Sequence, residues 1–576
     1  MATTHDLIVI GAGTGNYLFT PEFDGLRRAI VEPSRFGGTC LNRGCIPTKM
    51  FVVAADAVRS AQRAGRLGVH ARVESVDWSE IRDRIFGRID PLHAQAVDYR
   101  RKNGVDVYTD QARFVAPGRL QVGEVELSAE KVVLAAGSRP IVPAIRGLDE
   151  VEYHTSDTIM RIDNLPSSLL IIGGGFIAAE MGHVFSAFGV EVTIVHRGPR
   201  LLNGEDQQIA DRFTELAVQE MTVHLDAEVV RVEPSASGVV ATVETAQGQR
   251  EVSAEMLLVA AGRRPNSDLL DLSAAGIELD EHGHVVTDAA GATTAPGVWS
   301  LGDLANHFQL KHLANAEART MVHNLLHADD PKPLPTGLVP HAVFADPQVA
   351  SIGATQQQLE EAGIEYVVTV RAYADAAYGW ALEDTTGFVK LLADPRGRTL
   401  LGAHIIGPDA AVLIQPLIQA MMTGQTVDQI SREVMYIHPR ARYPARRRLV
   451  RATSSCMRGD SPIYPGVGVP QSGGDGNGIG GSASSVHPPR LTELGKTVLG
   501  RVRAHQRDRH LERCLHRTNV AGCLGEKISS LYGSQKPARH RPGIRIRSQD
   551  VASLQLVHRI DQQLGPCLEV GGNRSA

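Results

Sequence analysis

Residues 7–16 read LIVIGAGTGN, a short apolar run that passes directly into a glycine-rich turn. A strand that enters a helix through such a turn points backbone N–H groups and the helix N-terminus at a pyrophosphate. Glu32 closes the next apolar run, where a carboxylate accepts hydrogen bonds from a ribose hydroxyl pair. The stretch predicts the first strand of a dinucleotide-binding domain, with a tight turn without ligand as the alternative. The turn glycines are Gly11, Gly13 and Gly15.

A second copy of the pattern occurs at residues 169–178, which read LLIIGGGFIA. The strand expected after it, residues 190–195, ends in His196-Arg197 rather than in an acid. A cation pairs with a 2′-phosphate that a carboxylate would repel, so the sequence favours NADP over NAD, with Arg200 as a second contact. A solvated surface charge is the alternative for Arg197. The small residues of this turn are Gly173, Gly175 and Ala178.

Each turn is followed by a matching strand end, AAGSRP at residues 135–140 and AAGRRP at residues 260–265. One half of this region therefore reads as a duplicate of the other. We predict an α/β fold with two Rossmann-like dinucleotide-binding domains. A helical stretch at 313–327, a Pro-rich linker at 331–335, strand-like runs at 366–370 and 387–392, and an apolar helix at 410–422 complete the organisation.

The 576 residues carry 59 basic and 64 acidic side chains, but the charge is unevenly distributed. From residue 440 onward there are 20 Arg and 3 Lys against 9 acidic residues, a net charge of +14 that leaves −19 for the first 439 residues. An acidic body argues against nucleic acid as its partner. No apolar run approaches the ~18 residues of a membrane span, and the N-terminus lacks the basic region of a signal peptide. We expect a cytoplasmic protein.

Residues 37–49 read GGTCLNRGCIPTK and contain Cys40 and Cys45, the two cysteines that precede residue 440. Two cysteines on one helical turn reach bonding distance only with distortion, and strained disulfides are the reducible ones. In a reducing compartment such a pair is more often catalytic than structural. Zinc would need two further ligands, so a redox-active disulfide is expected, with unlinked buried thiols as the alternative.

Four further polar residues stand at positions where chemistry can be expected. Lys49 and Glu180 follow the cysteine segment and the second turn at corresponding places, and an ion pair between them near a flavin would face the position that becomes anionic on hydride uptake. Asp303 follows a strand-like run and could bind a ribityl hydroxyl, unless it is a plain turn residue. His438 could cycle a proton near neutral pH, or be an ordinary surface histidine.

In residues and in order, these features resemble the pyridine nucleotide-disulfide oxidoreductases, in particular the class that is similar to glutathione reductase. The resemblance covers roughly residues 5–439. Four stretches resemble one subgroup of this family most closely, the members that reduce the disulfide mycothione to the thiol mycothiol. They are residues 13–16, 86–91, 151–162 and 377–385.

The resemblance implies a relay in which NADPH displaces Phe176 and reduces FAD, and FAD then reduces the Cys40–Cys45 disulfide. Cys45 would face the flavin as a thiolate while Cys40 attacks the substrate disulfide. His438 would exchange protons in the active site of the other subunit, which implies a homodimer and a role in thiol redox balance. No metal is implied. The implied FAD contacts are Gly11, Gly13, Gly15, Glu32, Gly38, Thr39, Gly137, Gly302 and Asp303. The implied NADPH contacts are Gly173, Gly175, Phe176, Ala178, Arg197, Arg200 and Gly262.

The sequence departs from the family pattern at two places. Asn203 stands where similar members carry a second arginine, so phosphate binding would lean on Arg197 and Arg200. Tyr443 stands where the family has the glutamate that orients the histidine, and the usual Ala-Leu-Pro-Glu continuation into a dimer-interface helix is missing. We therefore expect lowered or absent activity in this chain.

The expected domains are an FAD domain at 1–150, an NADPH domain at 151–285, a return to the FAD domain at 286–335, and a truncated α+β dimerisation domain at 336–439. Residues 440–576 show no sustained hydrophobic period and are expected to be irregular or disordered. Their 20 Arg against 3 Lys favour a shifted reading frame over a basic arm that binds anionic surfaces.

Two other functions remain open at this stage. A dihydrolipoamide dehydrogenase would work with NAD in the oxidising direction, and His196-Arg197 speaks against it. A flavoprotein with an impaired C-terminus would bind FAD without turning over a disulfide.

Overall fold

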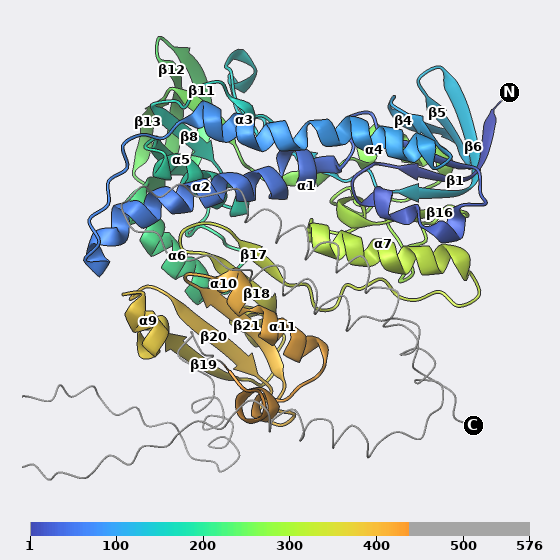
Figure 1. Ribbon diagram of the computed structural model, residues 1–576. Helices are drawn as coiled ribbons and strands as arrows, with labels where there is room; N and C mark the ends of the chain where they lie inside the picture. The colour runs from blue at the N-terminus through green and yellow to red at the C-terminus, as the bar shows by residue number, and fades with distance from the viewer. Residues whose placement is uncertain (1, 437–576) are drawn as a thin grey trace, which may run out of the picture. The chain divides into compact units, whose positions relative to one another are not determined.

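Strand β1 (Thr3–Ile10) lies inside a seven-stranded sheet of the computed structural model, which describes residues 2–436 (Figure 1). The main strand order is β3-β2-β1-β6-β5-β4, and β16 pairs with β6. Residues 7–10 are at most 2% exposed, as expected for a parallel strand that is covered on both faces. The other strands are β2 (Arg28–Val31), β3 (Val105–Tyr108), β4 (Ala112–Ala116), β5 (Arg119–Val122), β6 (Val125–Leu134) and β16 (Val298–Ser300).

The second glycine turn follows an inner strand of a fully parallel sheet, which has the order β10-β9-β8-β14. Its strands are β8 (Ser168–Ile172), β9 (Glu191–Val195), β10 (Thr222–His224) and β14 (Met256–Val259), and its helices are α5 (Phe176–Ala187) and α6 (Gln207–Glu220). The antiparallel strands β11 (Ala227–Ser235), β12 (Gly238–Thr245) and β13 (Gly248–Ala254) form a separate sheet. In each sheet the turn-bearing strand pairs in parallel with the next strand in sequence, so the predicted pair of Rossmann-like units is confirmed.

The two matching strand ends contact each other directly. Strand β7 (Ser138–Pro140) pairs antiparallel with β15 (Arg263–Pro265), and Arg139 lies opposite Arg264. The duplicated halves are therefore joined at equivalent positions.

Four α-helices lie between β2 and β3, and the first two contain the cysteine segment. They are α1 (Gly38–Arg43), α2 (Cys45–Arg63), α3 (Trp78–Ile89) and α4 (Pro91–Lys102). The ring of Phe51 on α2 stacks on that of Trp78 at 4.9 Å, and Phe185 of α5 lies 5.7 Å from Trp78. Helix α2 thus packs against both its neighbour α3 and the helix that follows the second glycine turn (Figure 1).

The third part of the fold is a five-stranded antiparallel sheet with the order β17-β18-β21-β20-β19. Its strands are β17 (His341–Val343), β18 (Val349–Gly353), β19 (Val367–Ala372), β20 (Phe388–Ala393) and β21 (Leu400–Ile406). The helices are α7 (Lys311–Leu326), which precedes this sheet, and α8 (Gln356–Glu361), α9 (Ala377–Ala381), α10 (Ala410–Leu413) and α11 (Gln415–Met422). The sheet and its helices confirm the predicted α+β domain.

Two helix predictions need correction. The first glycine turn enters a 3-10 helix, Thr14–Leu18, instead of an α-helix, because Asn16 Nδ2 donates to Ala12 O and competes with helical bonding. The helix predicted at 410–422 breaks at Ile414, because Pro416 lacks the amide that would continue the hydrogen-bond ladder.

The remaining elements are short. The other 3-10 helices are Pro21–Phe23, Ala64–Leu67, Leu148–Glu150, Ile159–Arg161, Ser267–Leu269, Leu272–Ala275, Gly302–Leu304 and Tyr373–Asp375, and Gln429–Glu433 is a π-helix. Among the described residues, no helix combines the length and apolar character needed to span a bilayer. His438, Tyr443 and the predicted basic tail at 440–576 lie outside the described residues.

A buried ion pair ties the second Rossmann-like unit to the antiparallel sheet. Asp206, the N-cap of α6, lies 2.7 Å through Oδ1 from Lys390 Nζ on β20, and the two side chains are 0% and 3% exposed. Asp206 Oδ2 also accepts a hydrogen bond from the Gln356 backbone N–H at 3.0 Å. The carboxylate is thus surrounded by donors from both parts of the fold.

We expect Lys390→Met to destabilise the protein by about 3–5 kcal/mol, because it leaves the Asp206 carboxylate buried without its counter-ion. Urea unfolding monitored by circular dichroism measures this loss. The matched control is Arg396→Met, which removes an ion pair with Glu365 whose side chains are 84% and 65% exposed, and which should change the unfolding midpoint little. Equal effects of the two substitutions would contradict the assignment.

Candidate active site

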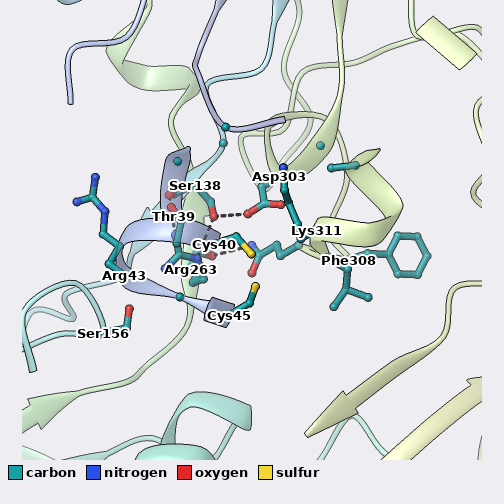
Figure 2. Close-up of a pocket in the computed structure, with 18 of the residues that line it drawn as sticks. Thr39, Cys40, Arg43, Cys45, Ser138, Ser156, Arg263, Asp303, Phe308 and Lys311 are labelled. Atoms are coloured by element: carbon teal, nitrogen blue, oxygen red, sulfur yellow. Dashed lines mark hydrogen bonds between the residues drawn. The ribbon is translucent and has the colours of Figure 1, made fainter. Parts of the chain in front are cut away.

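The cysteine segment forms two helices rather than the single helical turn expected from its spacing. Cys40 lies on α1 and Cys45 begins α2, with Gly44 between them. A Cβ on Gly44 would lie 3.0 Å from Thr39 O and 3.3 Å from Cys40 Cα, so a side chain here would require α1 to shift by a few tenths of an ångström. Both cysteines are free thiols, and Figure 2 shows their sulfur atoms facing one pocket.

The two thiols differ in acidity. A hydrogen bond from Cys40 and, less strongly, the charge of Lys49 lower the pKa of Cys45 to about 7 against the opposing effect of burial. The same hydrogen bond and burial raise the pKa of Cys40 well above its usual range. Near neutral pH the Cys45 thiol is therefore partly ionised, whereas Cys40 stays protonated.

Lys49 and Glu180 form an ion pair between α2 and α5. Lys49 Nζ lies 2.6 Å from Glu180 Oε1, and Glu180 also accepts the backbone N–H of Phe344 at 3.0 Å. The ammonium group lies 4.2 Å from the centre of the Phe344 ring. Helix α2, helix α5 and the segment after β17 thus meet one helical turn after Cys45. The Lys49 ammonium group places a positive charge there, which can stabilise a nearby thiolate or a developing anion.

One cavity of about 1570 Å³ connects the cysteine pair with both glycine turns. This volume exceeds the range of about 300–1,000 Å³ for a single drug-sized ligand. The predicted residues that line it are Gly11, Gly13, Glu32, Gly38, Thr39, Cys40, Cys45, Lys49, Gly137, Gly175, Phe176, Glu180, Gly302 and Asp303. The predicted residues that do not line it are Gly15, Gly173, Ala178, Arg197, Arg200 and Gly262.

The first turn has the geometry that a dinucleotide requires. A Cβ on Gly11, whose φ is +105°, would lie 2.2 Å from Ala135 O, and a Cβ on Gly38 would lie 2.7 Å from Gly13 Cα. The backbone segments pack this closely because these positions carry no side chain. Gly173 in the second turn makes the equivalent approach, 2.2 Å from Ala260 O with a φ of +134°.

Two carboxylates mark the ends of strands in the first sheet. Glu32 is 8% exposed and accepts the backbone N–H groups of Ala12 at 2.8 Å and Ser34 at 2.9 Å. Burial raises its pKa despite these bonds. Asp303 accepts the hydroxyl of Ser138 at 2.7 Å. Each carboxylate has four lone-pair sites, so both retain acceptor capacity for a sugar or ribityl hydroxyl. The residues present therefore fit FAD.

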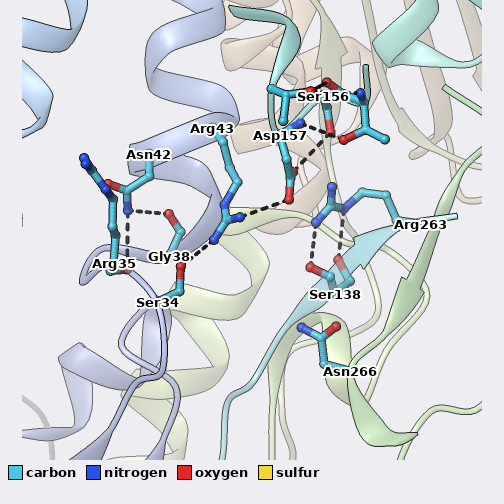
Figure 3. A network of polar contacts seen from close by, with 12 residues as sticks. Ser34, Arg35, Gly38, Asn42, Arg43, Ser138, Ser156, Asp157, Arg263 and Asn266 are labelled. Atoms are coloured by element: carbon cyan, nitrogen blue, oxygen red, sulfur yellow. Dashed lines mark hydrogen bonds and ion pairs between the residues drawn. The ribbon is translucent and has the colours of Figure 1, made fainter. Parts of the chain in front are cut away.

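Sequence reasoning missed five cationic residues that line the cavity, which are Arg35, Arg43, Arg139, Arg263 and Lys311. Lys311, the first residue of α7, donates through Nζ to Thr14 Oγ1 at 2.8 Å, and burial lowers its pKa. Arg263 donates to the Ser138 hydroxyl and carbonyl at 3.0 and 2.7 Å, and Arg43 lies 3.1 Å from Asp157 (Figures 2 and 3). Arg263 could have been noticed in the AAGRRP repeat, whereas no sequence signal identifies Lys311.

The residues expected to bind the 2′-phosphate in the second unit, Arg197 and Arg200, do not line the cavity. Arg197 is exposed, and Arg200 is bound through Nε to Asp211 Oδ1 at 2.5 Å. Asn203 and His196 instead line the cavity, joined by a hydrogen bond of 3.2 Å. A phosphate contact from Arg200 would have to compete with Asp211, so Arg197 is the freer of the two cations.

The comparisons with known proteins match most of the described chain to flavoprotein disulfide oxidoreductases. The family described as pyridine nucleotide-disulphide oxidoreductase matches residues 5–318, and the dimerisation domain of that family matches residues 339–443. Mycothione reductase of Mycobacterium tuberculosis H37Rv is 45% identical over 448 residues, which cover 76% of this chain and 96% of that protein. Mercuric reductase of Streptomyces lividans is 32% identical and covers 75% and 92%. Among solved structures, the HOCl-induced flavoprotein disulfide reductase RclA of Escherichia coli aligns with a TM-score of 0.67 at 26% identity, covering 78% of this chain and 99% of that one.

In the reduced protein, we expect alkylation of Cys45 by iodoacetamide to be half-maximal near pH 7, where half of its thiol is ionised. Cys40→Ala should move this midpoint upward, because the hydrogen bond that favours the thiolate is lost. Cys40→Ser is the control, since its hydroxyl still donates. Mass spectrometry can follow each site separately, because trypsin releases residues 36–43 and 44–49 as different peptides. Unchanged midpoints in both variants would contradict the account.

Proposed function

The chain belongs to the pyridine nucleotide-disulphide oxidoreductase family, and on this premise we propose that it transfers electrons from NADPH through FAD and the Cys40–Cys45 pair to mycothione. The product would be the thiol mycothiol. The observation that carries the proposal is the asymmetric thiol pair, with a Cys45 pKa of about 7, in a cavity that reaches both glycine turns. The identity of 45% to a mycothione reductase supports the choice of substrate.

The residues that would hold FAD are those of the first turn, together with Gly38, Thr39, Glu32 and Asp303. When bound there, FAD would supply the redox chemistry that takes up two electrons as a hydride and passes them to a disulfide. Lys311, which contacts Thr14 within the turn, is proposed as a further contact to the cofactor. Its half-buried ammonium group would then face an anionic or polar group of the ligand.

The disulfide step follows from the chemistry of the two thiols. Cys40, once deprotonated, attacks one sulfur of the substrate disulfide, and the other sulfur leaves as a thiolate that takes up a proton. The Cys45 thiolate then attacks the Cys40 sulfur of the mixed disulfide, which restores the protein disulfide and releases the second sulfur as a thiolate that takes up a proton from solvent. The pair is oxidised by two electrons and the substrate is reduced by two.

His438 is proposed to move the protons of this exchange, acting in the partner subunit of a homodimer. The match of the dimerisation domain to residues 339–443 supports the homodimer. The domain division proposed is 1–150 and 286–335 for FAD, 151–285 for NADPH, and 336–439 for dimerisation. Pairing of β16 with β6 is in accord with the return to the first domain. A cytoplasmic location fits the proposal.

Dihydrolipoamide dehydrogenase is the second candidate, because dihydrolipoyl dehydrogenase of Bacillus subtilis is 30% identical and covers 75% of this chain and 93% of that protein. His196-Arg197 at the end of β9 favours NADPH over NADH and hence the first proposal.

We expect NADPH to support faster reduction of mycothione than of glutathione disulfide or lipoamide, and NADH to be the poorer donor. Arg197→Ala should lower kcat/KM for NADPH by about tenfold, the effect of one lost charge-assisted hydrogen bond, and change the value for NADH little. Steady-state assays that follow nucleotide absorbance measure both, with the exposed Arg396→Ala as control. A preference for glutathione disulfide, or for NADH with lipoamide, would overturn the assignment.

We expect the chain as it stands to turn over more slowly than a version whose residues from 440 onward carry a family-like Ala-Leu-Pro-Glu ending. The neutral Tyr443 cannot fix the tautomer of His438 as a carboxylate does. Comparing kcat and FAD content of the two proteins tests this, and equal turnover would sink the idea. A chain that retains FAD but reduces no disulfide would support the impaired flavoprotein.

A further inference from the structure

Glu205 is a buried carboxylate that the proposed relay does not use. It is 6% exposed, and it accepts hydrogen bonds from His341 Nε2 at 2.7 Å and from the Ser351 hydroxyl at 2.6 Å. His341 and Ser351 are register partners on β17 and β18. Two adjacent strands of the antiparallel sheet thus hold one side chain of the second Rossmann-like unit, and Glu205 and His341 both line the cavity.

Glu205 belongs to the loop that covers the second glycine turn. Within this loop the Leu202 N–H donates to Gly174 O at 2.7 Å, and the Glu205 N–H donates to Leu202 O at 2.9 Å. Leu202 has a φ of +54°, an uncommon conformation for a leucine that tertiary contacts must stabilise. Asn203 carries the loop to the cavity wall beside His196. These contacts therefore fix the loop relative to the second glycine turn.

The other end of the contact leads to the cysteine pair. The residue after β17 is Phe344, whose N–H donates to Glu180 Oε1 at 3.0 Å and whose ring contacts Lys49. A continuous series of contacts hence runs from the loop through Glu205, His341 and β17 to the Lys49–Glu180 pair. The adjacent Asp206–Lys390 pair anchors the same loop on β20.

The charges of the pair support an ionic contact. Although burial opposes ionisation of both groups, the bonds from His341 and Ser351 lower the pKa of Glu205, and Glu205 raises the pKa of His341. The contact is therefore stronger than a bond between neutral groups. Sequence reasoning had no means to find it, because the two residues are 136 positions apart.

We propose that Glu205 and His341 are positioning residues. They hold the loop at residues 202–206 against strand β17, so that the bound nicotinamide nucleotide lies at a fixed position relative to Lys49 and Glu180. The inference rests on the proposed use of NADPH at the second turn. It assigns to the antiparallel sheet a part in nucleotide binding within its own subunit, separate from its part in dimerisation.

The test separates nucleotide binding from disulfide chemistry. Glu205→Ala should weaken NADP⁺ binding, measured by calorimetry on the FAD-loaded protein, by about tenfold, the effect of one lost charge-assisted bond. Stopped-flow measurements should show slower flavin reduction by NADPH. Reoxidation of the chemically pre-reduced enzyme by mycothione should change less than about twofold. Glu205→Gln, which can still accept from His341, should recover part of the loss. The matched control is Glu365→Ala, which removes a carboxylate that is 65% exposed.

Each outcome decides between the two proposals. If the unmodified protein neither binds NADP⁺ nor accepts electrons from NADPH, the proposed function fails at its first step. If it does both, and Glu205→Ala with full FAD content binds NADP⁺ equally well, the positioning role is wrong. The role is also wrong if both half-reactions slow to the same extent, because a general loss of structure would explain that result.

Discussion

The Lys49–Glu180 ion pair is the contact through which the two Rossmann-like units share one cavity. It connects the helix that begins at Cys45 to the helix that follows the second glycine turn, with side chains that are 32% and 7% exposed. Burying a carboxylate this far is unfavourable unless hydrogen bonds satisfy it, and the Phe344 N–H supplies one from a third part of the chain. A single pair therefore requires α2, α5 and the segment after β17 to be in place together, and the asymmetric thiols depend on that arrangement.

The sequence was sufficient where local patterns have one structural solution. Apolar runs before Gly11 and Gly173 predicted strands, and both glycines are required by backbone approaches of 2.2 Å. The repeat predicted two Rossmann-like units, and each turn-bearing strand pairs in parallel with the next strand in sequence. Contacts that depend on tertiary structure were not predictable: the partner of Arg200, the position of Lys311 against Thr14, and the bond between Glu205 and His341. Side chains and prolines also overrode helix expectations, as Asn16 does after the first turn and Pro416 does at Ile414.

The duplicated units have diverged at the position that distinguishes their ligands. In the first unit the strand after the turn leads to Glu32, a carboxylate turned inward and held by the Ala12 N–H. In the second unit the corresponding place holds His196, whose ring is so close to Gly174 that a Cβ there would lie 2.4 Å from it. The same backbone scaffold thus presents an acceptor in one copy and an imidazole followed by an exposed arginine in the other. Similar folds with opposite local charge can bind two different nucleotides side by side.

The pairing of β16 with β6 has a consequence for how the protein is made. Ser300 of β16 lies beside Leu134 of β6, and the whole second unit is inserted between these two strands in the sequence. During synthesis the first sheet remains without this strand until the ribosome has added the intervening residues. At about 5–20 residues per second this takes roughly 10–30 seconds. The second unit consists of a chain segment that is complete before then, so it can fold before the unit that begins the sequence is finished.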